Sequence, residues 1–108
     1  MVNYYHHNEP FALELGGQLD ELRIAYHTYG TLNDDKSNVV WVCHALTANS
    51  DVQDWWPHTV EEGKFLDPAH NFVVCANILG SPYGTTSHCT PIRRRDIHIS
   101  RIPEIYNP

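Results

Sequence analysis

The segment 43–48, with the sequence C-H-A-L-T-A, has the residue types and the position that best suit chemistry. It follows the apolar run 39–43, which is typical of a strand buried on both faces. Ligands of open α/β sheets bind beyond the carboxyl ends of such strands, so this loop is well placed for a site. Backbone N–H groups fixed in a loop of this kind can stabilise an oxyanion during acyl transfer. From position alone, a simple connecting turn remains the alternative.

The other groups needed for nucleophilic catalysis are not found in the sequence. Ser50, Ser81 and Ser87 lack the flanking glycines of the strand–turn–helix elbow G-x-S-x-G. Cys43 and His44 do not form a nucleophile–base pair, because adjacent residues of a strand point to opposite faces. We therefore predict that the nucleophile is absent from these 108 residues, and with no nucleophile to activate we assign no base or acid within them.

Alternating segments near the amino terminus predict an antiparallel hairpin. Residues 11–15 alternate between large apolar side chains and small or polar ones, which is the period of a half-buried strand. The pair Gly16-Gly17 tolerates a positive φ and suits a tight turn. Residues 22–28 alternate again, so we expect them to pair with 11–15 as the second strand of the hairpin.

Two apolar runs without alternation, 39–43 and 72–76, predict buried parallel strands. The connection 44–71 is long enough for a right-handed βαβ crossover, and we expect it to contain one short helix. An antiparallel hairpin followed by parallel strands indicates an α/β fold. The α/β-hydrolase fold begins in this way, and we predict that the chain forms an incomplete, amino-terminal part of that fold.

Composition limits the class of protein. The chain has 108 residues, enough for one small domain. Its formal net charge is −6, and residues 1–87 alone carry three basic and eleven acidic side chains, which argues against a nucleic-acid partner. The apolar runs are too short to span a membrane. The cysteines Cys43, Cys75 and Cys89 show no C-x-x-C spacing, so we expect reduced thiols in a cytosolic protein, the first two of them buried. The histidines lack metal-ligand spacing, and we predict no metal site.

Several motifs resemble those of homoserine O-acetyltransferases and occur in that family's order. Residues 25–33 resemble A-Y-x-T-Y-G-x-L-N, and residues 43–47 resemble the start of C-H-A-L-T-G. The pair Trp55-Trp56 matches two adjacent tryptophans of the family. Residues 72–80 resemble F-V-x-x-x-N-x-L-G, and residues 84–87 resemble the start of G-S/T-T-x-P.

This resemblance, which covers residues 11–87 nearly continuously, implies a homoserine O-acyltransferase of the α/β-hydrolase fold. Such enzymes transfer an acyl group, usually acetyl, from coenzyme A to the hydroxyl of L-homoserine, a step of methionine biosynthesis. The resemblance implies acetyl-CoA as co-substrate, no bound cofactor, a cytoplasmic location, and a homodimer for the intact family member. An acetyl or a succinyl donor remains open. The alternatives are a non-catalytic truncated product and an esterase-like relative of the same fold.

The resemblance also assigns one role within the site. One oxyanion-hole donor of the family maps onto the backbone N–H of Leu46, and the other follows the catalytic serine. The sequence departs from the family pattern at Ala48, where the family usually has glycine. A methyl group there restricts the φ and ψ angles of the loop.

The family pattern stops at Ser87. The family continues as P-L-x-x-N-P-x-T-G-x-x-Y-F, whereas residues 88–99 are H-C-T-P-I-R-R-R-D-I-H-I. One interpretation is a divergent basic tail that forms a solvated or RNA-binding patch. The other, which we favour, is a frameshift. In the reading frame that starts at the last base of the Ser87 codon, allowed codons can spell P-L-H-S-N-P-A-T-G-H-T-Y-F. Either codon for His88 forces the leucine, whereas most other residues are only permitted by the codon choices.

We therefore predict residues 1–87 to be the amino-terminal portion of an α/β-hydrolase domain and residues 88–108 to be a non-family tail. The isoleucines of the tail fit neither the helical nor the strand period, so we expect it to pack poorly. We also expect a polypeptide of these 108 residues to transfer no acyl group, because the absent catalytic groups supply most of the rate enhancement.

Overall fold

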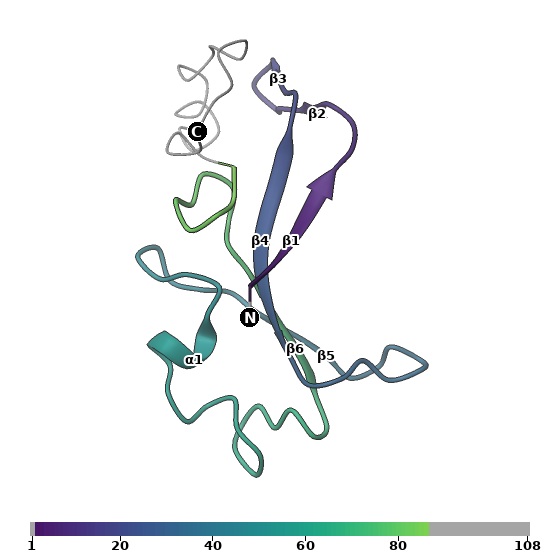
Figure 1. The fold of residues 1–108 in the computed structure, drawn as a ribbon, viewed down its shortest axis with the longest axis vertical. Coiled ribbons are helices and arrows are strands. Elements are labelled where there is room, and N and C mark those ends of the chain that lie inside the picture. Colours follow the sequence, from purple (N-terminus) through teal and green to yellow (C-terminus); the bar gives the residue numbers. More distant parts are fainter. Residues whose placement is uncertain (1, 87–108) are drawn as a thin grey trace.

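The computed structural model describes residues 2–86 as a four-stranded mixed sheet, a separate two-stranded ladder and one short helix (Figure 1). The elements in chain order are β1 (Val2–His7), β2 (Phe11–Ala12), β3 (Gln18–Leu19), β4 (Leu22–Tyr29), β5 (Val39–Val42), α1 (Val52–Trp55) and β6 (Phe72–Ala76). The strand order of the main sheet is β1-β4-β6-β5. No helix among the described residues is long and apolar enough to cross a membrane.

The predicted parallel pair is confirmed. β5 and β6 lie side by side in parallel, with Val39 opposite Phe72 and Val42 opposite Cys75. The connection between them contains α1, the short helix expected there. β4 pairs with β6 in the antiparallel sense, so the antiparallel and parallel parts share one sheet.

The predicted hairpin is wrong in its pairing. β4 pairs not with residues 11–15 but with β1, in antiparallel register from Val2–His27 to His7–Leu22. The two-glycine turn closes only the short ladder of β2 and β3. The reason is that β1 is an edge strand with mostly exposed side chains, so its sequence shows no apolar alternation.

One face of the sheet carries the hydrophobic core, which the crossover between β5 and β6 covers. The buried members of the core cluster are Val52, Val60, Leu66, Val73 and Cys75. Val40 and Val42 of β5 pack against this cluster, opposite Val73 and Cys75 of β6. Burial of each such aliphatic side chain contributes about 1.5–3 kcal/mol to folding.

The other face of β5 is open to solvent, so the expectation of a strand buried on both faces is wrong for β5. Val39 and Trp41, which alternate with the packed valines, are 46% and 62% exposed. An apolar run without alternation has two hydrophobic faces, and residues 2–86 cover one of them. The expected burial of Cys43 is wrong for the same reason, whereas Cys75 is buried; both are free thiols.

Residues 88–108 lie outside the described part of the chain, as does Ser87. The expected boundary at Ser87, the state of Cys89 and both interpretations of the tail therefore stay predictions.

Gly30 follows β4 at a point where a side chain would overlap the backbone. Its φ is +83°, and a Cβ atom there would meet the carbonyl oxygens of Asn71 and Pro68. Gly16 is the matched control, since its φ is +95° but its Cβ would meet nothing within 4 Å. We expect Gly16→Ala to lower the free energy of unfolding by about 1–2 kcal/mol, and Gly30→Ala to lower it by about 4 kcal/mol or more. Urea unfolding of both variants measures this, and equal losses would contradict the steric argument.

Candidate active site

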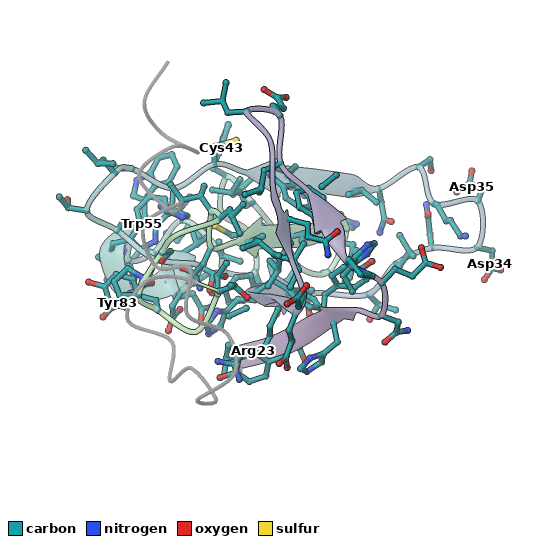
Figure 2. All side chains as sticks on the ribbon, turned by 90° about the horizontal axis from the view of Figure 1, so that it is seen from above. Arg23, Asp34, Asp35, Cys43, Trp55 and Tyr83 are labelled. Carbon is teal, nitrogen blue, oxygen red and sulfur yellow. The ribbon has the colours of Figure 1, made fainter. Side chains whose placement is uncertain are left out.

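Two loops meet at one edge of the sheet because β5 and β6 run parallel. The carboxyl end of β5 leads into residues 43–48, and that of β6 leads into residues 77–80. The Ile78 N–H joins the loops by donating a hydrogen bond to Nε2 of His44 at 3.2 Å. Figure 2 shows Cys43, at the start of the first loop, well away from Asp34 and Asp35, which lie at the right of the view.

A β-turn at residues 45–48 places Leu46 at its first central position. The Ala48 N–H donates to the Ala45 carbonyl oxygen at 2.9 Å. Neither central residue has a positive φ, as in a type I turn, and Ala48 also lacks one, so its methyl group fits without strain. The Leu46 side chain is 89% exposed, and its N–H makes no hydrogen bond to any residue of the range 2–86. This N–H is therefore accessible, while its role as an oxyanion donor stays a prediction.

The ring of His44 has a partner at each nitrogen. Nδ1 lies 2.7 Å from the Ala45 carbonyl oxygen, which can only accept, so Nδ1 carries the proton. Nε2 is then unprotonated and accepts from the Ile78 N–H. The two partners together assign the neutral Nδ1–H tautomer to His44.

Asn77, directly after β6, holds separate segments together behind this edge and is only 2% exposed. Its Oδ1 accepts from the Ser50 N–H at 2.8 Å, and its Nδ2 donates to Ser50 Oγ at 2.8 Å and to the Tyr83 carbonyl at 3.0 Å. Its backbone N–H donates to the Ala25 carbonyl at 2.9 Å, and its own carbonyl accepts from Thr85 Oγ1 at 3.1 Å. Burial of this amide is tolerated because both ends of it are hydrogen-bonded.

Ser50, His27 and Asp51 have the residue types of a Ser–His–Asp triad but not its geometry. Ser50 Oγ lies 2.8 Å from His27 Nδ1, whereas His27 Nε2 is 4.0 Å from Asp51 Oδ2, beyond hydrogen-bond range. Ser50 is 1% exposed, and its Oγ already accepts from Asn77. A nucleophile must reach the substrate carbonyl, so we interpret this group as a structural network.

Burial shifts the pKa values of three groups near this network in the direction that favours their uncharged forms. Burial lowers the pKa of His27, although the neighbouring Asp51 carboxylate opposes the shift. Burial, with a hydrogen bond from the hydroxyl to Asp51, raises the pKa of Tyr29 to about 12. Burial also raises the pKa of Cys75 to about 11, so its thiolate is not available as a nucleophile. In the part of the chain that the structure describes, no group of three or more His, Cys, Asp or Glu residues could hold a metal ion.

The sequence did not reveal the cluster of Asn77, Ser50 and His27, because its members are far apart along the chain. Ser50 and Asn77 are 27 residues apart, and no period links them. A partial signal was present, since both polar residues follow closely after predicted parallel strands, whose carboxyl ends share one edge. The tryptophan pair was recognised, and Trp55 donates its indole N–H to the Asn49 carbonyl at 2.8 Å, next to Ser50.

Comparison with known proteins identifies the relatives of the chain. No family model matches it. Homoserine O-acetyltransferase of Chlorobaculum tepidum is 55% identical over 85 residues, which are 79% of this chain and 24% of that protein. Homoserine O-acetyltransferase of Trichormus variabilis is 48% identical over 85 residues, with the same two coverages. Over most of its length, the chain is similar to proteins named homoserine O-acetyltransferase. It spans about a quarter of the length of the curated relatives it matches.

Solved structures confirm the predicted fold. The acetyl esterase MekB superposes with a TM-score of 0.73 at 25% identity, over 86% of this chain and 26% of that one. Homoserine O-acetyltransferase from Bacillus anthracis gives a TM-score of 0.68 at 27% identity, over 88% of this chain and 30% of that one. The chain therefore has the amino-terminal part of an α/β-hydrolase fold.

Acidification should weaken the fold through His27. The folded state lowers the pKa of His27 below the ordinary value of 6.5, so below that pH the unfolded chain binds the proton more readily. The free energy of unfolding should therefore fall as the pH drops from about 8 to about 5. We expect a smaller fall in His27→Gln, whose amide can still bond Ser50 but does not titrate. Urea unfolding across this range measures both proteins, and parallel pH curves would contradict the assignment.

Proposed function

We propose that the chain is the part of a homoserine O-acetyltransferase that supplies one oxyanion-hole donor, the Leu46 N–H. The observation that carries the proposal is the 55% identity to the Chlorobaculum tepidum protein over 79% of this chain. The accessible N–H in a turn after a parallel strand supports the role given to Leu46, because α/β-hydrolases draw a donor from this loop. The reaction moves an acetyl group from acetyl-CoA to the hydroxyl of L-homoserine.

In this reaction the Leu46 N–H donates to the oxygen that becomes negative when the acyl carbonyl is attacked. A fixed donor stabilises that charge more in the transition state than in the ground state, and it therefore raises kcat. The sequence contains no G-x-S-x-G, so the proposal assigns the nucleophile, base and acid to polypeptide outside these 108 residues. By itself, a chain of these residues transfers no acyl group.

The proposal extends to the setting of the reaction. Acetyl-CoA and L-homoserine are substrates, no cofactor is held, and the intact protein is a homodimer that acts in methionine biosynthesis. The free thiols of Cys43 and Cys75 support a reducing, cytoplasmic compartment. The net charge of −6 disfavours nucleic acid as a partner. Residues 1–87 form the amino-terminal portion of the catalytic domain, and 88–108 form a non-family tail.

Hydrolysis of acetyl esters is the second candidate function. It is favoured by the superposition on the acetyl esterase MekB, whose TM-score of 0.73 exceeds the 0.68 of the acetyltransferase from Bacillus anthracis. Both reactions need the same oxyanion donor and differ in the acceptor of the acyl group, which is water in one case and the homoserine hydroxyl in the other. The acceptor therefore decides between them.

The test uses a chimera in which residues 2–86 replace the matching segment of the Chlorobaculum tepidum protein. Leu46→Pro removes the N–H, and proline suits the first central position of a type I turn. Leu46→Ala keeps the N–H and is the matched control. We expect Leu46→Pro to lower kcat about 10²–10³-fold and Leu46→Ala to change it by no more than about threefold. Release of free coenzyme A from acetyl-CoA measures the rate.

The same assay separates the candidates. An acetyltransferase releases coenzyme A only when L-homoserine is present, whereas an esterase hydrolyses p-nitrophenyl acetate without stimulation by homoserine. Equal losses in Leu46→Pro and Leu46→Ala would remove the role proposed for this N–H. A folded but inactive chimera would refute the acetyltransferase proposal. Coenzyme A release by the 108-residue chain without the graft would refute the assignment of the nucleophile to other polypeptide.

A further inference from the structure

We propose that His44 is a positioning residue that fixes the direction of the Leu46 N–H, an inference that rests on the proposed function. His44 does not contact the reacting atoms in this scheme. It acts through the backbone of the turn and through the neighbouring loop.

The first step of the argument is the planarity of the peptide bond. The Ala45 carbonyl and the Leu46 N–H belong to one peptide group, and no cis peptide bond occurs in residues 2–86. In a trans peptide the C=O and N–H point in opposite directions. Nδ1–H of His44 holds the Ala45 oxygen at 2.7 Å, and the Ala48 N–H holds it at 2.9 Å. Whatever fixes that oxygen therefore fixes the Leu46 N–H on the opposite side.

The second step concerns the tie between the two loops. The β5–β6 ladder ends at the pair Val42–Cys75, and the Ser50–Asn77 bonds join the two loops again farther along the chain. Between these two points, next to the turn, the Ile78 N–H to His44 Nε2 bond at 3.2 Å ties the loops. It joins residues 34 apart in sequence, so chain connectivity does not compensate for its loss.

The two bonds make the same ring a link between the sheet and the donor. The bond at Nε2 fixes the ring relative to the backbone after β6. The bond at Nδ1 then fixes the peptide group that carries the Leu46 N–H relative to the ring. A misplacement of about 1 Å at a catalytic group can lower a rate about 100-fold. The ring is therefore placed to affect the rate without binding either substrate.

The experiment uses the same chimera, with L-homoserine and acetyl-CoA. His44→Leu removes both bonds and should lower kcat about 10–100-fold with KM for either substrate unchanged, because the donor acts in the transition state. His44→Asn keeps a donor within reach of the Ala45 oxygen, and His44→Gln keeps an acceptor within reach of the Ile78 N–H; each should recover part of the loss. His6→Leu, at an exposed site on β1, is the control and should leave kcat unchanged.

A readout independent of activity accompanies the kinetics. Histidine labelled with ¹⁵N in the chimera should show His44 with a protonated Nδ1 and an unprotonated Nε2. An Nε2–H tautomer would overturn the proposal, as would a His44→Leu variant with unchanged kcat, or Asn and Gln variants as slow as His44→Leu. If the unsubstituted chimera is folded and inactive, the proposed function fails, and the tautomer still decides whether His44 ties the two loops.

Discussion

The closed set of hydrogen bonds around Asn77 is the constraint on which the rest of the structure depends. One buried side chain joins the loop before α1, through Ser50, to the segment after β6, through Tyr83. The backbone of the same residue binds β4 through the Ala25 carbonyl. A buried polar group left without a partner costs about 1–3 kcal/mol. These segments can therefore separate only when several hydrogen bonds break at once. The hydrophobic core is small, so it does not replace the stability that these bonds contribute.

This constraint explains why the turn with Leu46 is held in place although its residues are exposed. On one side the turn continues from β5, which is fixed by its ladder with β6. On the other side it leads to Ser50, which is fixed by Asn77. The ring of His44 connects the turn to the loop after β6 between these two points. A backbone donor in a solvent-exposed loop thereby gains the fixed position that stabilisation of an oxyanion needs.

The sequence predicted the parts of the fold that depend on local pattern. The apolar runs identified β5 and β6, and the motifs indicated the homoserine O-acetyltransferases to which the chain is similar. The partner of β4 was not predictable, because β1 is an exposed edge strand whose aromatic and polar residues show no alternation. The exposure of Trp41 was not predictable either. Its apolar side chain predicts burial, but no segment within residues 2–86 packs over it. The Asn77 network was missed because its bonds span 27 and 52 residues, a distance over which no sequence period is informative.

Hydrogen exchange at the Ser50 amide tests the central claim most directly. Ser50 lies in a loop outside every strand ladder of the described residues, yet its N–H donates to the buried Oδ1 of Asn77. If the Asn77 network holds the fold together, this amide should exchange as slowly as the amides of β6, and far more slowly than the accessible N–H of Leu46. Exchange at Ser50 as fast as at Leu46, with β6 still protected, would show that the network does not hold the loop and would contradict the account.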